Sequence, residues 1–205
     1  MIGIINYGMG NVGSIQNMIR HVGGESIIID DPDQIRGVDK VIIPGVGAFD
    51  NGMTKLHARG FVQALDEHVE RKGKPVLGIC LGMQLLTMAS EEGEAAGLGW
   101  IRARAVKFQF NGSGESKLRV PHMGWNAVTY RKETAINKNT EEEPRYYFVH
   151  TYHVVCEDEQ DVLCTCEYGH TVVAGIARSQ IYGLQFHPEK SHKYGMTILR
   201  NFSNL

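Results

Sequence analysis

The sequence predicts a single-domain α/β protein with a central, largely parallel sheet, flanking helices and a β-rich second half. Two observations support this fold class. Short apolar runs alternate with helix-like segments through residues 1–90, the pattern of βαβ units around a sheet buried on both faces. From Val120 onward, strand-like segments follow one another with short turns, which indicates a mixed or antiparallel section.

Each predicted element is bounded by the residues around it. Glycine, proline or paired aspartates end the apolar runs, and apolar residues at helical spacing mark the helices. In the first half, the predicted strands are Ile2–Asn6, Ser26–Ile29, Lys40–Ile43 and Pro75–Ile79, and the predicted helices are Asn11–His21, Thr54–Arg71 and Leu81–Ser90. The β-rich segments are Val120–Tyr130, Arg145–Val155, Val162–Glu167, Thr171–Ala177 and Gln180–Phe186, and a helix around Tyr194–Phe202 follows. Gln109–Lys117 is a predicted mobile loop.

Length and composition are those of an ordinary globular protein. The 205 residues suffice for one substantial domain and contain no evident linker, so we expect one domain over residues 1–205. A net charge of −2 argues against nucleic acid as a partner. We expect no membrane association, because there is no signal peptide, membrane-spanning run or polybasic segment. Four cysteines without a secretion signal are typical of a cytoplasmic protein.

A dinucleotide-binding fingerprint is the first candidate site. Gly8–Gly13 reads GMGNVG between a predicted strand and a predicted helix, and Asp30 follows at about the ~20-residue distance of that motif. Such a turn would direct backbone N–H groups and a helix N-terminus at a pyrophosphate. An ordinary glycine-rich turn at the edge of a parallel sheet has the same pattern, and Asn6 and Tyr7 place polar bulk before the first glycine. The motif alone leaves both interpretations open.

A cysteine elbow is the second candidate site. An apolar strand runs into Gly78-Ile79-Cys80-Leu81-Gly82 and then into a predicted helix, with cysteine at the position that serine takes in a nucleophile elbow. Glycines on either side allow the sharp turn, and the start of a helix favours the thiolate. The amide N–H of Leu81 would face a developing oxyanion. A buried packing cysteine between two glycines is an equal alternative until a base is found.

The base is supplied by His187-Pro188-Glu189 at the end of a predicted strand. Side chains two residues apart in an extended segment point the same way, so Glu189 can orient His187. Because active sites of α/β sheets form at the carboxyl ends of strands, His187 can meet Cys80 there. A lone histidine is usually structural, but a histidine–carboxylate pair together with the cysteine elbow favours a catalytic triad.

Two weaker patterns concern a metal and a second oxyanion donor. His150, His153, Cys156, Cys164 and Cys166 lack the paired spacing of zinc sites, and the two histidines would face opposite sides of one strand, so we expect no metal. The glycine turn Gly45-Val46-Gly47 would bring backbone N–H groups close to a substrate carbonyl, although a plain turn has the same sequence.

Six segments then carry a resemblance to a known family. The chain resembles the class I, triad-type glutamine amidotransferases, and among them it is similar to HisH-type glutaminase subunits of imidazole glycerol phosphate synthases. The cysteine elbow and His-Pro-Glu are shared across the class, whereas PHMGWN and the continuation HPEKS are more specific to the HisH type. The matching segments are Asn6–Asn11, Pro44–Phe49, Gly78–Leu85, Pro121–Asn126, Tyr147–Tyr152 and Gln185–Ser191.

The resemblance implies a flavodoxin-like amidotransferase fold that hydrolyses L-glutamine without a cofactor or metal. Cys80 would be the nucleophile, and His187 and Glu189 would complete the triad. It also implies that the turn at Gly8–Gly13 faces a partner protein and holds no nucleotide. Oxyanion and substrate contacts are implied for Gly45, Val46, Gly47, Leu81, Gln84, Thr151 and Tyr152.

The implied partner is a separate HisF-type cyclase that receives the ammonia in a heterodimer during histidine biosynthesis. A (β/α)8 synthase needs about 250 residues of its own, so it cannot be part of this chain. Asn11, Trp125 and Lys190 are the expected interface residues. Asn6 stands where many HisH-like sequences have aspartate. This difference affects the expected detailed contacts of the interface and not the triad.

Three alternatives stay open at this level. A paralogous glutaminase could supply ammonia to a sugar amidotransferase in surface-polysaccharide synthesis, which the stretch Ser191–Met196 would suit. A dinucleotide-binding module with a structural cysteine is a second alternative. A free-standing cysteine hydrolase is the third.

Overall fold

The computed structural model describes residues 1–110 and 118–205, so most of the predicted loop Gln109–Lys117 lies outside the described residues. Its strands are β1 (Ile2–Ile5), β2 (Ser26–Ile29), β3 (Lys40–Gly45), β4 (Val76–Cys80), β5 (Ala89–Ser90), β6 (Ala103–Lys107), β7 (His122–Ala127), β8 (Thr129–Tyr130), β9 (Arg145–His150), β10 (Tyr152–Cys156), β11 (Val162–Glu167), β12 (Thr171–Arg178) and β13 (Ile181–Leu184). The α-helices are α1 (Val12–His21), α2 (Phe49–Ala58), α3 (Phe61–Asp66), α4 (Leu81–Leu85) and α5 (His192–Ser203).

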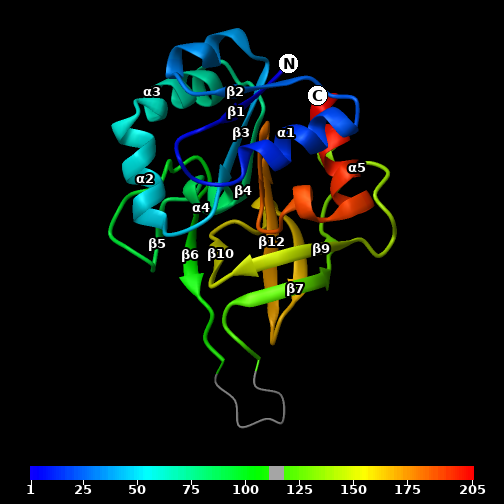
Figure 1. The fold of residues 1–205 in the computed structure, drawn as a ribbon. Helices are drawn as coiled ribbons and strands as arrows, with labels where there is room; N and C mark the ends of the chain where they lie inside the picture. Colours follow the sequence, from blue (N-terminus) through cyan, green and yellow to red (C-terminus); the bar gives the residue numbers. More distant parts are fainter. Residues whose placement is uncertain (111–117) are drawn as a thin grey trace.

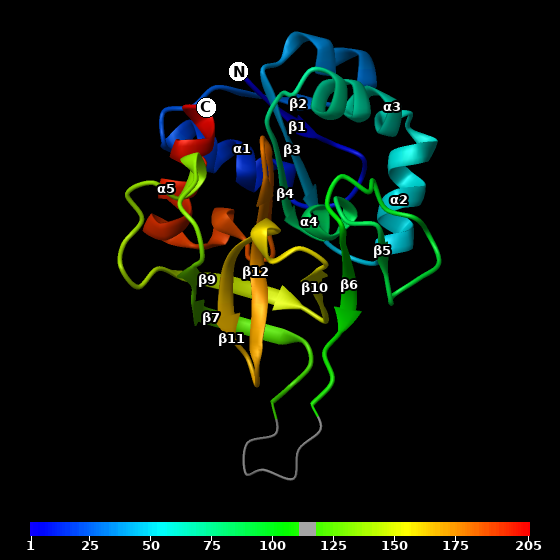
Figure 2. The ribbon, with the colours of Figure 1, turned by 180° about the vertical axis from the view of Figure 1, so that it is seen from behind.

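One large sheet organises these elements (Figure 1). Five neighbouring strands run parallel in the order β2-β1-β3-β4-β13, the order of flavodoxin-like sheets. Antiparallel strands β12, β10 and β6 continue the sheet beyond β13. Strands β7 and β9 form a separate antiparallel ribbon across the lower half of the molecule (Figure 2). The predicted α/β class, with a parallel first half and a mixed second half, is confirmed.

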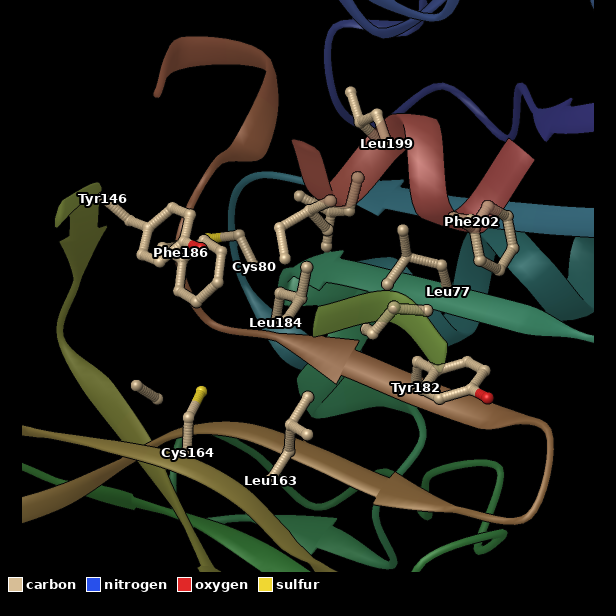
Figure 3. Packing of buried hydrophobic residues seen from close by; sticks show 14 of the residues in the cluster. Leu77, Cys80, Tyr146, Leu163, Cys164, Tyr182, Leu184, Phe186, Leu199 and Phe202 are labelled. Carbon is tan, nitrogen blue, oxygen red and sulfur yellow. The ribbon is translucent and has the colours of Figure 1, made fainter. Parts of the chain in front are cut away.

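Helices cover both faces of the parallel sheet, because successive residues of each strand belong to two different apolar clusters. Ile4 belongs to one cluster and Ile5 to the other, as expected when successive side chains of a strand point to opposite faces. Helices α1 and α5 cover the first face, where Leu199 and Phe202 lie near Leu77 (Figure 3). Helices α2, α3 and α4 cover the second face. The helices leave the carboxyl ends of the parallel strands uncovered, and α4 begins at this edge of the sheet.

The single helix predicted over Thr54–Arg71 is wrong. The chain forms α2, breaks at Arg59 and Gly60, and continues through α3 into a π-helical turn at Glu67–Arg71. Gly60 has φ of 73°, a left-handed conformation that glycine adopts at low cost and that ends a helix. Apolar spacing continued across the break because both helices bury their residues against the same face of the sheet.

Other boundaries also differ from the predictions. The helix predicted over Leu81–Ser90 ends at Leu85, and Ala89–Ser90 instead forms β5 beside β6. Strand β6 was not predicted, because its buried residues are small alanines with a weak periodic signal. The segment Arg145–Val155 divides at Thr151 into β9 and β10, which belong to different sheets. Among the described residues, no helix is both long and apolar enough to cross a membrane.

Helix α4 approaches the sheet more closely than any side chain would permit. A Cβ atom on Gly82 would lie 1.8 Å from the carbonyl oxygen of Ile43, and one on Gly78 would lie 2.5 Å from the carbonyl oxygen of Gly82. Both contacts involve backbone atoms, which cannot move away as a flexible side chain can. Glycine at these two positions therefore sets the distance between α4 and strands β3 and β4.

Gly82→Ala is expected to lower the free energy of unfolding by about 3 kcal/mol, the upper end of ordinary overpacking effects, because its methyl group must displace backbone. Chemical denaturation measures the change. Gly37→Ala is the matched control, since a Cβ there meets no atom within 4 Å. Equal stability of the two variants would contradict the proposed packing limit.

Candidate active site

Cys80 occupies a strained turn between β4 and α4. Its φ and ψ are 55° and −110°, and it is one of the few non-glycine residues with positive φ in the described chain. A left-handed non-glycine residue costs about 1–3 kcal/mol, and such strain clusters at functional sites. Its Sγ atom accepts from Gln185 Nε2 at 3.8 Å and lies 3.9 Å from the carbonyl oxygen of Val149. The strained elbow holds the thiol at the edge of the sheet.

His187 and Glu189 lie just beyond the end of β13. His187 Nδ1 and Glu189 Oε1 are 2.7 Å apart, and both side chains are almost fully buried. The side chains meet as expected, but the expected extended geometry is wrong, because Pro188–Lys190 forms a 3-10 turn. The turn brings the carboxylate back to the imidazole.

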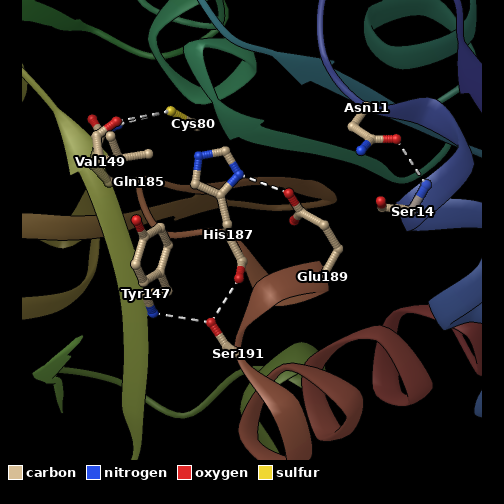
Figure 4. A network of polar contacts seen from close by, with 9 residues as sticks. All are labelled: Asn11, Ser14, Cys80, Tyr147, Val149, Gln185, His187, Glu189 and Ser191. Atoms are coloured by element: carbon tan, nitrogen blue, oxygen red, sulfur yellow. Dashed lines mark hydrogen bonds and ion pairs between the residues drawn. The ribbon is translucent and has the colours of Figure 1, made fainter. Parts of the chain in front are cut away.

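The His187 imidazole stands between Cys80 and Glu189 (Figure 4). Nδ1 is bound to the carboxylate, and the buried Nε2 has no hydrogen-bond partner among the described residues. Burial lowers the pKa of His187, but interactions with Cys80 and Glu189 outweigh burial and raise it to about 9. The imidazole is therefore held in its protonated form at neutral pH, with Nε2 available as a proton donor.

Ser191 fixes the main chain of His187 and was missed from the sequence. Its hydroxyl donates to the His187 carbonyl oxygen at 2.6 Å and accepts from the Tyr147 N–H at 3.0 Å. The Tyr147 carbonyl accepts from the His187 N–H at 2.9 Å. Ser191 is fully buried, so these bonds tie the turn to β9 away from water. The HPEKS motif was the available signal, but a motif does not show what its serine contacts.

A pocket of about 400 Å³ opens beside Cys80. Six of the predicted substrate and oxyanion residues line it, namely Val46, Gly47, Leu81, Gln84, Thr151 and Tyr152. Gly45 does not line this pocket: it pairs with Cys80 in the sheet, and a Cβ on it would meet Leu81 and the Tyr7 hydroxyl at 2.8 Å. Gly45 thus serves the close packing behind the site.

Glu92 also lines this pocket and was missed from the sequence. Its carboxylate accepts from the Phe49 N–H at 2.8 Å, which fixes the side chain. Among the described lining residues it is the one acidic side chain. Glu92 stands in an acidic run, SEEGE, that looks like an ordinary solvated surface. Only the fold brings it to the pocket of Cys80.

The glycine-rich turn at Gly8–Gly13 has contacts that favour the ordinary-turn interpretation. Asn11 caps α1 with its own side chain, which accepts from the Ser14 N–H at 3.0 Å. The Asp30 carboxylate accepts from the Asn6 side chain at 2.7 Å. A Cβ on Gly10 would lie 3.0 Å from Pro44 Cβ, so this glycine allows the turn to pack against the end of β3.

The histidine and cysteine residues considered for a metal are placed differently from the expectation. His150 and His153 do not face opposite sides of one strand: they lie on β9 and β10, and both rings pack against Phe108 with centroids 5.3 and 4.7 Å away. Burial raises the pKa of Cys156 and of Cys166 to about 12, and it raises the pKa of Cys164 well above its ordinary value. In the described part of the chain, no group of three or more potential ligands is assembled.

The three expected interface residues gather along one edge of the molecule. Asn11 and Lys190 line a second pocket, which also contains His187. The Lys190 Nζ atom lies 5.7 Å from the centre of the Tyr147 ring, and Trp125 lies edge-on to the same ring. Trp125 remains 46% exposed although it stacks on His192. Tyr147 therefore links residues that are far apart in sequence.

Comparison with known proteins identifies the family. The model of the class-I glutamine amidotransferase family matches residues 3–204. Among solved structures, one described as a glutamine amidotransferase covers 97% of this chain and 98% of its own, with a TM-score of 0.72 and 16% identity. The structure of PurLQS from Thermotoga maritima covers 98% and 94%, with a TM-score of 0.67 and 18% identity. These two likenesses concern the fold alone.

Curated relatives narrow the family further. "Imidazole glycerol phosphate synthase subunit HisH 2" of Methanococcus maripaludis is 50% identical over 98% of both chains. The protein of the same name from Pseudomonas aeruginosa is 46% identical, and "Imidazole glycerol phosphate synthase subunit HisH" of Leptospira borgpetersenii is 44% identical, each over the full length of both chains. The chain therefore belongs to the class-I glutamine amidotransferases and, within them, to the HisH family, which confirms the resemblance seen in the sequence.

The raised pKa of His187 predicts that stability depends on pH. A folded pKa of about 9 against an ordinary value of 6.5 stabilises the folded state fully below pH 6.5, and this contribution is lost as the pH rises through 9. The difference corresponds to about 3 kcal/mol. Chemical denaturation between pH 6 and 10 measures it. The decline should flatten in Glu189→Gln, which lacks the carboxylate, and an identical decline in both proteins would contradict the assignment.

Proposed function

We propose that this chain is the glutaminase subunit of an imidazole glycerol phosphate synthase, acting as one amidotransferase domain. The observation that carries the proposal is the buried His187–Glu189 pair beside the strained Cys80, where a pocket opens. The HisH names of full-length relatives support the assignment of the synthase. Glutamine is the substrate, and ammonia is the product that leaves for a second subunit.

Charge and hydrogen bonding in the pocket suit free glutamine. The carboxylate of Glu92 is placed to bind the positive α-amino group of the substrate. Both N–H groups of the Gln84 amide are bound within the protein, to Tyr152 O and Gln185 Oε1 at 3.1 Å, so its own oxygen is left to accept from the substrate. The side-chain carboxamide of glutamine would then reach Cys80.

The first chemical step forms a thioester. The Cys80 thiolate attacks the carboxamide carbon, and the negative charge moves to the carbonyl oxygen. That oxygen would accept from the Leu81 N–H, which has no partner within α4 because it lies in the first turn, and from N–H groups of the Val46–Gly47 turn. The protonated His187 gives its Nε2 proton to the departing nitrogen, and the C–N bond breaks to release ammonia.

The second step regenerates the enzyme. Neutral His187 takes a proton from a water molecule, and the resulting hydroxide attacks the thioester carbon. Glutamate leaves, and the Cys80 thiolate is restored beside protonated His187. Glu189 keeps the imidazole in one orientation through Nδ1 and stabilises its positive charge in both steps.

Ammonia released into neutral water would be protonated and lose its nucleophilicity, so we propose a heterodimer with a HisF-type cyclase. Asn11, Trp125 and Lys190, together with Tyr147, form the proposed contact edge. The exposed Trp125 ring suits an interface, where aromatic residues are enriched. We place the complex in the cytoplasm, which the four free thiols support.

Cys80→Ala is expected to abolish glutamine-dependent synthesis in the complex and to leave ammonia-dependent synthesis by the cyclase intact, because the variant removes only the nucleophile. Paired assays with glutamine and with ammonium salts measure the two activities. Cys156→Ala, at the end of β10 and outside the residues that line the pocket, is the matched control. Equal loss of both activities in Cys80→Ala would refute the division of labour.

A sugar amidotransferase in surface-polysaccharide synthesis is the second candidate recipient of the ammonia. The observation in its favour is that the relatives from Methanococcus maripaludis and Pseudomonas aeruginosa are both named "HisH 2". Affinity capture from the native organism, followed by identification of the bound synthase, distinguishes the two. We expect a HisF-type cyclase without a sugar amidotransferase, and capture of a sugar amidotransferase without the cyclase would favour the second recipient.

A further inference from the structure

Two buried glutamine amides and the Tyr152 carbonyl form a directed series of hydrogen bonds that ends at the Cys80 sulfur. The Tyr152 carbonyl accepts from Gln84 Nε2 at 3.1 Å, and Gln84 Nε2 also donates to Gln185 Oε1 at 3.1 Å. Gln185 Nε2 then donates to Cys80 Sγ at 3.8 Å. Gln185 is fully buried and Gln84 is 5% exposed. The chain therefore places an amide N–H, shielded from water, against the reacting atom.

The orientation of both amides is determined by their partners. Tyr152 O can only accept, so the Gln84 NH2 group must face it. The second hydrogen of that NH2 group requires an acceptor, which is Gln185 Oε1. The Gln185 NH2 group is then left to face Cys80. A flip of either amide would oppose two acceptors or two donors in a buried site, which costs free energy.

The Tyr152 carbonyl, the acceptor at the start of this series of hydrogen bonds, is also fixed in place. His150 Nδ1 lies 2.8 Å from Tyr152 O, so it must carry the hydrogen and donate. His150 Nε2 then accepts from His122 Nδ1 at 3.0 Å. Burial lowers the pKa of His150 to about 3 and that of His122 to about 4, so both rings stay neutral and keep these roles. Tyr152 O is thus a fixed acceptor for Gln84.

We infer that Gln185 is a further catalytic residue, whose side-chain N–H stabilises the Cys80 thiolate. This inference rests on the proposed function of Cys80 as nucleophile. A donor bound to the charged form of a group favours that form. His187 supplies positive charge but must give up its proton during the reaction, whereas the Gln185 amide keeps its hydrogen throughout. Gln185 therefore adds a second, non-transferable donor to the thiolate that begins the reaction and to the thiolate that leaves the thioester at its end.

Other titratable groups near Cys80 must be held constant in the test. His187 stands beside it from the turn after β13, with Glu189 behind, and Tyr7 interacts with it from the turn after β1. Glu92 and His150 line the pocket that Cys80 shares. None of these side chains hydrogen-bonds to Gln185 among the described contacts, so a change at Gln185 leaves their own hydrogen bonds in place.

The test is the pH dependence of alkylation of Cys80 by iodoacetamide, in the full-length chain, with the modified peptide quantified by mass spectrometry. Gln185→Met keeps the length of the side chain and removes the N–H donor. The midpoint of its alkylation curve is expected to rise by about one pH unit, which makes alkylation about tenfold slower at pH values well below both midpoints. Gln16→Met is the matched control, since this amide lies on α1 and donates to Ser26 O.

A curve for a folded Gln185→Met protein that superimposes on the wild-type curve would overturn the inference. If that variant does not fold, Gln84→Met replaces it: losing the group that orients Gln185 should raise the midpoint by less, in the same direction, and an unchanged midpoint again overturns the inference. Failure of the proposed function would look different. In that case, complete alkylation of wild-type Cys80 would leave glutaminase activity intact.

Discussion

The fold and the site both depend on how closely α4 approaches the parallel sheet. Glycine at positions 78 and 82 lets the helix backbone lie against the backbone of β3 and β4, where a single methyl group would not fit. The chain can connect β4 to a helix this close only through a sharp turn, which puts Cys80 into a left-handed conformation. The strain at Cys80 is therefore a consequence of packing, and it is compensated by the apolar cores on both faces of the sheet.

The same turn determines the chemistry around the sulfur. Cys80 is held at the carboxyl edge of the sheet, between a charged pair on one side and neutral amides on the other. The His187–Glu189 pair provides a proton that can be transferred, whereas the amide of Gln185 is a donor that cannot ionise in this pH range. Hydrogen bonds from Ser191 and from the backbone of Tyr147 hold the turn that carries the charged pair against β9. One edge of the sheet thus combines a donor that can transfer its proton, His187, with a donor that keeps its proton, Gln185.

The contact edge proposed for the partner begins within the same group of residues. Lys190 follows Glu189 directly in the chain, and its charge lies over Tyr147, whose backbone also binds His187 and Ser191. A protein docked on Lys190 and Trp125 would therefore contact residues next to Glu189 and Tyr147, which themselves bind His187. This proximity gives the proposed heterodimer a physical route by which docking can affect His187.

Local patterns in the sequence determined the fold class and the elbow. Continuous apolar runs, glycine spacing and the His-Pro-Glu motif express constraints within a few residues, so they could be recognised without tertiary structure. Helix breaks such as Gly60 were missed because periodicity continued across them, and the extended geometry assumed for His187 and Glu189 was replaced by a turn. Glu92, Ser191 and Gln185 acquire their contacts only when distant segments meet. The sequence alone determined which residue is the candidate nucleophile, whereas the tertiary structure decided what surrounds its sulfur, because those contacts join residues as much as 105 positions apart.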